Sequence, residues 1–338
     1  MNALRLLALA ALLAVTASLQ AAPDRIPASG TPGRYLKRTE VREFIAQMVE
    51  RHGFVRRELE TLFRKAAFQP DIVRAMTPPA EAPVRSWQNY RAMFVNPQRI
   101  EAGLKFRERN ASALQRAADQ FGVPAEIILA IIGVETVYGR NMGRYRVIDA
   151  LATLAFDYPR RADFFRSELE QFLLFTREAG IDLLGVRGSY AGAFGIPQFM
   201  PGSYRRFAVD FDGDGIVDLR ASPADAVGSV ANFLKEHGWR RGEPVQLLAH
   251  VAGEAHRPML EAGIEPKFTL ASLGQHGVET SSSLPMETTV ALIDLPTPEA
   301  PTEYRLGMRN FYVLTRYNRS SFYAAAVYDL AQELKLRR

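Results

Sequence analysis

The sequence predicts a mainly helical α+β protein with a small β subdomain near its C-terminal end, and two observations support this fold class. Apolar residues recur at helical spacing from about residue 39 onward, beginning with Val41, Phe44 and Met48. Between 241 and 308, Pro, Thr, Ser and Gly become frequent, and the run TTVALIDL has the composition of a strand. A helical core with a small β insertion is therefore expected.

Helices are expected in order along the chain, with turn signals between them. The first should follow Thr39 as its N-cap. Further helices are expected near 55–67, 97–120, 125–138, 163–179 and 223–236. Pro124 and Pro223 fit first-turn positions, and Gly180 fits a helix end. The segment MTPPAEAP is expected to be a loop, and residues 309–338 should form a strand or loop followed by a helix.

Composition limits the classes of function. Hydrophobic residues make up 47% of the 338 residues and charged residues 23%, which is typical of a globular chain with two or three packed units. The net charge of +5 favours an anionic partner, but the basic residues form no stripe, which argues against a nucleic-acid binder. The sequence contains no cysteine, which excludes disulfides, a thiol nucleophile and a thiolate metal site.

The N-terminus has the pattern of a secretory signal peptide. Arg5 precedes the apolar run LLALAALLAVTASL, and small residues lead to Ala21, where cleavage is expected. The run is shorter than the roughly 20 apolar residues of a membrane-spanning helix. Residues 1–21 are therefore expected to be a signal peptide, and residues 22–35, rich in Pro, Gly and Ser, a flexible leader.

Glu135 is a lone carboxylate in the apolar stretch AIIGVETVYGR. On a helix at 125–138, Ile128, Ile131 and Ile132 precede it by seven, four and three positions and share its face. Loss of hydration disfavours a carboxylate and raises its pKa, and a carboxylic acid that keeps its proton near neutral pH can act as a general acid. The alternative is a glutamate that reaches water from the end of the helix.

A second stretch, GSYAGAFGIPQFMPGSY at 188–204, combines glycines, aromatic residues and an amide. Glycines let the backbone approach a ligand closely, and Ser189 and Gln198 offer neutral hydrogen bonds. Its aromatic side chains are candidates to lie along sugar rings. The run YNRSSFY at 317–323 likewise combines an amide with tyrosines. The alternative for the first stretch is a packed loop between helices.

The acidic run DFDGDGIVD matches the first part of an EF-hand loop. Asp210, Asp212 and Asp214 stand at positions 1, 3 and 5, and the Ile216 carbonyl at position 7. Position 12 is an alanine where a bidentate glutamate is usual, so Asp225 from the next helix is expected to close the site. Asp225 also fits a capping box at the start of that helix, and whether Asp218 contributes stays open. Structural calcium is expected, with sodium as the alternative ion.

Five separated motifs, in this order, resemble the membrane-bound lytic murein transglycosylase B family: GVETVYGR, GSYAGAFGIPQFMPGSY, DFDGDG, VGSVANFLKEHGW and TRYNRSSFYAAAV. The likeness covers roughly residues 35–335. It implies a lysozyme-like catalytic core, an N-terminal helical domain and a small β domain. It also implies cleavage of the MurNAc–GlcNAc bond of peptidoglycan without water, which leaves 1,6-anhydro-MurNAc ends. The expected division of the chain is an N-terminal helical region at 36–96, a catalytic core at 97–240 with a calcium loop at 210–225, a β subdomain at 241–308, and a C-terminal part of the core at 309–338.

The resemblance implies a role for each residue that matches a family motif, and Glu135 would be the single catalytic acid and base. Hydrogen bonds to the glycan would come from Ser189, Gln198 and Asn318. The residues that would line the groove or face the peptide stem are Tyr90, Tyr317, Tyr323, Phe233, Arg160 and Arg161. Phe233 departs from the family pattern, in which a tyrosine is expected, so a hydroxyl contact is lost.

A single carboxylate is sufficient for this chemistry, although ordinary glycosidases need two. Protonated Glu135 would give its proton to the leaving O4, and the N-acetyl group of MurNAc can stabilise the cation at C1. The ionised carboxylate would then take the proton of the C6 hydroxyl as that hydroxyl attacks C1. No organic cofactor is expected.

Two other functions stay open from the sequence: a hydrolytic lysozyme of the same fold, which would use Glu135 and water, and a non-catalytic calcium-dependent wall-binding protein. Lipid-anchored members of the family carry a cysteine after the signal peptide, so the lack of cysteine predicts a soluble periplasmic protein without a membrane anchor. Peptidoglycan glycan strands are the expected partner, with other cell-wall enzymes as further candidates.

Overall fold

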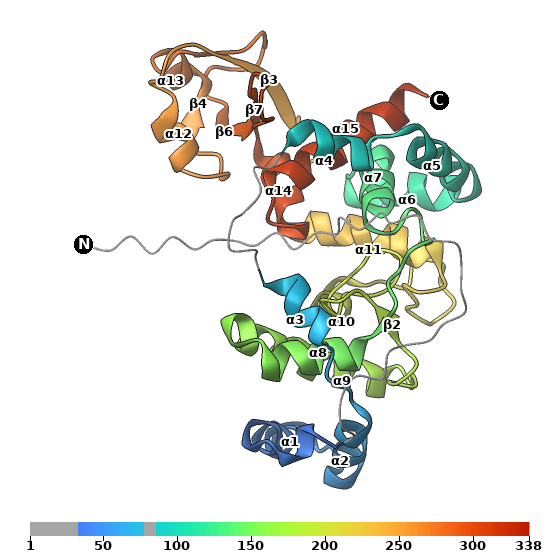
Figure 1. The fold of residues 1–338 in the computed structure, drawn as a ribbon. Coiled ribbons are helices and arrows are strands. Elements are labelled where there is room, and N and C mark those ends of the chain that lie inside the picture. The colour runs from blue at the N-terminus through green and yellow to red at the C-terminus, as the bar shows by residue number, and fades with distance from the viewer. Residues whose placement is uncertain (1–32, 78–85, 338) are drawn as a thin grey trace. The chain divides into compact units, whose positions relative to one another are not determined.

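The computed structural model describes residues 33–77 and 86–337 (Figure 1). The expected signal peptide, nearly all of the leader, and most of the loop expected at 76–83 lie outside the described residues. The described chain is mainly helical with one small β-sheet and a separate two-stranded ribbon, which confirms the predicted fold class. No single described helix is long and apolar enough to cross a membrane; α6 (Ala111–Phe121) and α7 (Ala125–Thr136) meet that criterion only jointly, as a pair bent by 116°.

The chain divides into two compact units, which are described separately. Unit 1 comprises the described residues of Glu81–Asn141 and Phe207–Arg338, and unit 2 those of Ala11–Ala80 and Met142–Arg206. This division does not follow the boundary expected at residue 96, so the domain boundaries stay a prediction.

Unit 2 is built around α8, whose residues are buried almost throughout because it packs between α3 and α9. Its C-terminal Asp157 accepts hydrogen bonds from Arg38 and from Tyr35, which ties the N-terminal turn to this helix. The elements of unit 2 are η1 (Tyr35–Lys37), α1 (Thr39–His52), α2 (Arg56–Lys65), α3 (Pro70–Met76), β1 (Tyr145–Arg146), α8 (Val147–Asp157), η2 (Pro159–Arg161), α9 (Ala162–Glu178), β2 (Arg187–Gly188) and α10 (Pro201–Phe207).

Unit 1 is built around α7, against which α5, α6, α11 and α15 pack. Nine of its twelve residues are buried, so this helix is apolar on all sides rather than on one face. The helices of the unit are α4 (Trp87–Phe94), α5 (Pro97–Arg109), α6 (Ala111–Phe121), α7 (Ala125–Thr136), α11 (Pro223–Glu236), α14 (Arg309–Tyr317) and α15 (Ser321–Leu336).

The β subdomain of unit 1 is an antiparallel sheet in the order β4-β6-β7-β3-β5 with two short helices (Figure 1). The central strand β7 pairs with β6 at Leu292↔Leu306 and with β3 at Leu247↔Leu306. Leu292 and Leu306 lie in its small apolar core. The strand expected from TTVALIDL is confirmed as β6. Its elements are β3 (Gln246–Val251), α12 (Arg257–Glu261), β4 (Phe268–Thr269), α13 (Leu270–Gly274), β5 (Val278–Glu279), β6 (Thr289–Leu295) and β7 (Glu303–Gly307).

Four local predictions are wrong. Pro124 is the N-cap of α7 and not a residue of its first turn. The single helix expected near 97–120 is two helices, because the chain leaves helical geometry at Asn110, where φ is −122° and ψ is 22°. The first residues of 309–338 form helix α14 and not a strand or loop. Its aromatic and β-branched residues favour a strand by propensity, but burial of one amphipathic face overrides that preference. Thr39 is the first residue of α1 and not its N-cap, which is Arg38.

Candidate active site

Glu135 lies in the last turn of the buried helix α7. Ile128, Ile131 and Ile132 are all fully buried, as the spacing predicts. Glu135 itself is only partly buried, so its carboxyl group meets both the apolar interior and the surface. This is the environment in which a carboxyl group loses much of its hydration and stays accessible to a ligand.

The hydrogen-bond partner of Glu135 comes from α15, and a residue of α14 packs against that partner. The hydroxyl of Tyr323, in the first turn of α15, donates to Oε1 of Glu135 at 2.7 Å, although the two residues are 188 positions apart in sequence. The ring of Tyr323 stacks on that of Tyr317, with centroids 6.4 Å apart and planes 13° apart. Tyr317 in turn meets the edge of the Phe233 ring at 4.9 Å. Unit 1 therefore brings four of the predicted site residues together.

The electrostatics of Glu135 suit proton exchange at neutral pH. Loss of hydration is the largest effect and raises the pKa of Glu135 to about 7. The hydrogen bond from Tyr323 and the positive charge of Arg99 act in the opposite direction. A carboxyl group with this pKa carries a proton in about half of the molecules at pH 7, so it can serve as acid and as base.

Three other predicted residues of unit 1 have distinct positions. Tyr90 on α4 lies beside the site, because its ring contacts Phe322, the neighbour of Tyr323, at 5.5 Å. Phe233 is only 6% exposed, since its ring also stacks on His237 at 4.0 Å. Its contact with a sugar stays a prediction. Asn318 lies between α14 and α15 and is half-buried.

Ser189 and Gln198 lie in one compact loop of unit 2. The Ser189 Oγ accepts from Ala193 N at 3.1 Å, which closes a tight turn. Gln198 has a left-handed backbone (φ 52°), and its Nε2 donates to the carbonyls of Met142 and Gly195 at 3.1 and 3.0 Å. Both amide hydrogens are thereby directed at the backbone, so Oε1 is the atom of Gln198 available to accept from a sugar.

The aromatic residues of this loop differ from the sequence expectation. Phe194, Phe199 and Tyr204 are at most 4% exposed and do not face solvent, because they pack inward. Phe194 and Tyr204 stack on each other at 5.2 Å, and Phe175 of α9 packs against both. These rings support the loop by packing on one another and on α9, as expected for the alternative of a packed loop between helices.

Arg160 and Arg161 form the exposed turn η2 of unit 2. The Arg161 guanidinium lies 4.2 Å from the centre of the Phe164 ring, which holds that side chain against α9. Their predicted contact with a peptide stem remains a prediction.

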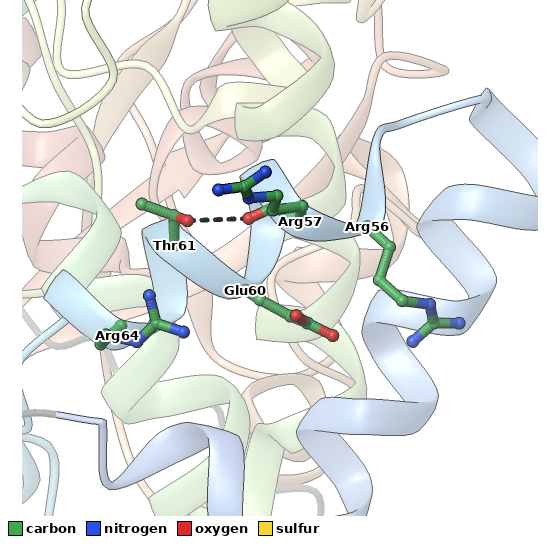
Figure 2. A pocket seen from close by; sticks show the side chains of 5 residues that line it. All are labelled: Arg56, Arg57, Glu60, Thr61 and Arg64. Atoms are coloured by element: carbon green, nitrogen blue, oxygen red, sulfur yellow. Dashed lines mark hydrogen bonds between the residues drawn. The ribbon is translucent and has the colours of Figure 1, made fainter.

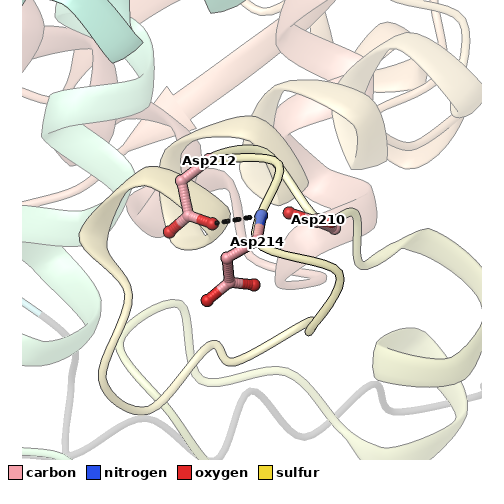
Figure 3. A group of neighbouring side chains, drawn as sticks. All are labelled: Asp210, Asp212 and Asp214. Carbon is pink, nitrogen blue, oxygen red and sulfur yellow. Dashed lines mark hydrogen bonds between the residues drawn. The ribbon is translucent and has the colours of Figure 1, made fainter.

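The acidic loop of unit 1 gathers three carboxylates. Asp210, Asp212 and Asp214 each offer an oxygen, and these atoms lie within 4.8 Å of one another (Figure 3). Gly213 and Gly215 have φ of 82° and 85°, the left-handed geometry that lets the loop turn around its centre. A set of oxygen donors at this spacing suits calcium, which prefers carboxylate and carbonyl oxygens.

Asp225 has a different place in this loop. It is fully buried, and its Oδ1 accepts from Phe211 N at 2.7 Å while Oδ2 accepts from Asp218 N at 2.8 Å. The backbone N–H of Asp225 donates to Ser222 Oγ, so this part of the expected capping box is confirmed. Asp225 thus anchors the loop to α11 in the structure, and its role as a metal ligand stays a prediction.

Comparison with known proteins decides the family. Residues 37–332 match the model of the transglycosylase SLT domain. The chain belongs to this family. It is 41% identical over 314 residues to the membrane-bound lytic murein transglycosylase B of Escherichia coli, which covers 90% of this chain and 85% of that protein. The resemblance predicted from the motifs is therefore confirmed.

Solved structures agree with this assignment. The soluble lytic transglycosylase SltB1 of Pseudomonas aeruginosa is 47% identical, with a TM-score of 0.83 over 88% of this chain and 99% of that chain. The Escherichia coli Slt35 in complex with calcium is 42% identical, with a TM-score of 0.82 over 92% and 96% of the two chains. The protein is therefore a lytic transglycosylase with a lysozyme-like core.

Sequence reasoning missed two residues near Glu135 of this transglycosylase. Arg99 on α5 donates to the carbonyl of Gly133 at 2.7 Å, and Tyr138 packs its ring against the same glycine. Arg99 carried no sequence signal, because it is one of many arginines on predicted helices. Tyr138 follows Glu135 by three positions, and its place in the motif GVETVYGR was the one signal that could have pointed to it.

A surface depression of about 610 Å³ lies along α2 in unit 2 of the transglycosylase (Figure 2). It is lined by Arg56, Arg57, Glu60, Thr61 and Arg64, all from this one helix. None of the predicted site residues lines it.

Proposed function

We propose that this transglycosylase cleaves the MurNAc–GlcNAc bond of peptidoglycan without water and leaves 1,6-anhydro-MurNAc ends, with Glu135 as its single acid and base. The proposal is supported by the environment of Glu135. Its carboxyl group has a pKa near neutrality and accepts a hydrogen bond from Tyr323. The name of the Escherichia coli relative, a murein transglycosylase, supports the substrate.

The surroundings of Glu135 fit a reaction with one carboxylate. The described groups that shift its pKa are a tyrosine and an arginine, and neither can replace the second carboxylate of an ordinary glycosidase. The substrate then supplies the remaining groups. Protonated Glu135 gives its proton to O4 of the leaving GlcNAc as the bond from C1 to O4 breaks, and the MurNAc N-acetyl oxygen stabilises C1. Glu135, now ionised, removes the proton of the C6 hydroxyl while the oxygen of that hydroxyl bonds to C1.

Tyr323 has a defined part in both halves of this cycle. Its hydroxyl donates to Oε1, so it holds the carboxyl group in one orientation and leaves Oε2 to exchange the proton. Hydrogen bonds to the glycan are assigned to Ser189 and Asn318, and to Gln198 through its Oε1. The remaining contacts follow the family motifs: Tyr90, Tyr317 and Phe233 along the sugars, and Arg160 and Arg161 toward the peptide stem.

The decisive experiment compares wild type with Glu135→Gln on purified sacculi, followed by mass spectrometry of the released muropeptides. Wild type should release products with anhydro ends, which are lighter by one water than hydrolysis products. Glu135→Gln should lose at least two to four orders of magnitude in rate, since general acid–base catalysis is worth about 10²–10⁴ per transfer.

Glu126→Gln is the matched control, because Glu126 lies in the first turn of the same helix and pairs with Lys335 at 3.4 Å. It should keep wild-type activity. Reducing ends in the wild-type products would assign a hydrolytic lysozyme instead. A fully active Glu135→Gln protein would show that another residue is the acid.

A structural calcium ion at Asp210, Asp212 and Asp214 is the second part of the proposal. The convergence of their oxygens and the calcium complex of Slt35 support it. The Ile216 carbonyl and Asp225 would complete the site. Asp225 would have to give up its hydrogen bonds from backbone N–H groups to bind the ion. Sodium is the alternative ion. The ion would fix the loop that precedes α11 and would take no part in the reaction.

Thermal melts with calcium and with a chelator test the calcium site. Calcium at 100 times its Kd should stabilise wild type by about 2.7 kcal/mol by mass action. Asp212→Ala should abolish the calcium response, and Asp163→Ala, an exposed aspartate of unit 2, should keep it. Identical wild-type melts in both conditions would disprove the site.

Export is the third part of the proposal. The signal-like start and the lack of cysteine support a soluble periplasmic protein without a lipid anchor. Cell fractionation should recover the mature chain, cut after Ala21, in the periplasmic fraction. Its recovery in the outer membrane after a high-salt wash would contradict this localisation.

A further inference from the structure

The chain leaves α7 through an unusual backbone that begins two residues after Glu135. Val137 and Tyr138 both have left-handed backbones, with φ of 51° and 60°, and Gly139 follows with φ of 85°. Non-glycine residues rarely adopt this conformation, and two in succession require support from the surrounding structure. Backbone hydrogen bonds from Val137 to Gly133 and from Tyr138 to Ile132 support the turn, and the side chain of Tyr138 adds further contacts.

The ring of Tyr138 fills a space that two glycines leave between helices. A Cβ atom at Gly103 of α5 would lie 2.3 Å from the Tyr138 hydroxyl oxygen, and one at Gly133 of α7 would lie 2.5 Å from it. The hydroxyl is buried and makes no hydrogen bond to any described residue. The ring therefore acts by its shape, as a wedge between α5 and α7.

Arg99 also contacts the last turn of α7. Its Nη1 donates to the carbonyl of Gly133 at 2.7 Å and to that of Val134 at 3.3 Å, the two residues before Glu135. These are carbonyls of the last helical turn, where a positive charge is favourable. The Arg99 N–H donates to Asn96 at the start of α5, and its guanidinium lies 5.1 Å from the Phe94 ring centre, so the side chain is held in place.

We infer that Arg99 and Tyr138 are positioning residues for Glu135 that together hold the last turn of α7 and place the acid at the glycosidic bond. This inference rests on the proposed function of Glu135. Neither residue is assigned a contact with the substrate. We call the pair the α7 clamp.

The charge of Arg99 gives the α7 clamp a second effect that a purely structural contact would lack. The groups that face Glu135 are Tyr323 from α15, Tyr317 from α14 and Arg99 from α5, and Tyr138 faces Arg99. Arg99 is the cation among these described groups, and its charge lowers the pKa of Glu135 against the loss of hydration. Removal of the charge should therefore raise that pKa.

The test is the pH dependence of kcat/KM for Arg99→Met on sacculi. The alkaline limb should move to higher pH by about one unit, the lower end of the range for a nearby opposite charge, and the maximal rate should fall severalfold. Arg107→Met is the matched control: Arg107 also lies on α5 and also donates to carbonyls, those of Leu334 and Arg337, away from Glu135. Its alkaline limb should stay in place.

Arg99→Lys keeps the cation with fewer donors, so its alkaline limb should stay near that of wild type while its rate falls. If Arg99→Met has the pH profile of Arg107→Met, the inference is wrong. An active Glu135→Gln protein would refute the proposed function instead. A readout without activity compares the melting temperatures of Arg99→Met with and without Glu135→Gln across pH. The gain in melting temperature from Glu135→Gln should begin to rise at the same pH in the Arg99→Met background as in wild type. It should level off at a pH about one unit higher than in wild type.

The Tyr138 half of the α7 clamp is tested by two substitutions. Tyr138→Phe keeps the wedge and removes a hydroxyl that has no partner, so kcat should stay within about twofold of wild type. Tyr138→Ala empties the space between Gly103 and Gly133, and its kcat should fall at least tenfold with a smaller change in KM. Equal losses in both variants, or no loss in Tyr138→Ala, would overturn the role of the ring.

Discussion

Replacement of Glu135 by Gln should stabilise the protein, and the gain should depend on pH. Burial raises the pKa of Glu135 from 4.5 to about 7 in the folded state. The folded protein therefore binds the proton more tightly than the unfolded chain. The stabilisation that this proton contributes is fully present below pH 4.5 and is lost progressively as the pH rises to about 7. Gln carries no such proton, so the variant escapes this loss.

The size of the gain follows from the shift in pKa. Each unit corresponds to about 1.4 kcal/mol, so the shift from 4.5 to about 7 corresponds to about 3 kcal/mol. Gln can still accept the hydrogen bond from Tyr323, so the two proteins should have similar stability at pH 4.5. Above pH 7.5 the variant should be more stable by about 3 kcal/mol, or about 5 °C in melting temperature for a protein of this size.

The assay is a series of thermal melts of both proteins between pH 4 and pH 8.5, and the quantity of interest is the difference in melting temperature. Glu126→Gln serves as control, because loss of its charge removes an ion pair with Lys335 and should give no gain. A difference between wild type and Glu135→Gln that stays constant over this range would refute the argument, since it would mean that the carboxyl group is not desolvated in the fold.

Three further predictions follow from individual contacts. Tyr323→Phe removes a donor to the Glu135 carboxylate, so the pKa of Glu135 and the alkaline limb of kcat/KM should rise by roughly one unit, which a pH–rate profile would detect. Gly143→Ala places a Cβ 2.1 Å from a backbone oxygen at a φ of 92°, so circular dichroism melts should show a clear loss of stability, and unchanged melts would contradict the model of this turn. Asp329→Asn leaves the buried Arg305 guanidinium, 2.6 Å away, without its main counter-charge, and urea titration should reveal a loss of about 3 kcal/mol; a loss below 1 kcal/mol would argue against this ion pair.

The apolar surroundings of Glu135 were predictable from sequence because they depend on local spacing. Glu135 and three isoleucines share one helix, and helical geometry alone places them together. Residues that act across the fold were not predictable in this way. The contact of Arg99 with the turn before Glu135 joins residues 34 positions apart, and no periodicity in the sequence reports such a pairing. The position of the Tyr138 ring could be predicted only by knowing that Gly103 and Gly133 leave space for it between α5 and α7.

Packing also explains where aromatic residues were misjudged. A run rich in glycine and aromatic residues suggested rings along a sugar, yet Phe194 and Tyr204 pack inward. Sequence composition does not distinguish a ring that faces a ligand from one that supports the loop beneath it. In α14 the same kinds of residue suggested a strand, while burial of Phe311 and Leu314 selected a helix.

The hydrogen bond between Tyr323 and Glu135 has a consequence for the time at which the enzyme becomes active. Glu135 is made in the first half of synthesis, but its partner Tyr323, on α15, is made 188 residues later. A nascent or prematurely terminated chain that ends before this helix has neither the donor nor the packing that desolvates the carboxyl group. If Glu135 is the acid as proposed, the catalytic group is therefore completed only when synthesis is nearly finished, and a fragment that ends before α15 should lack activity.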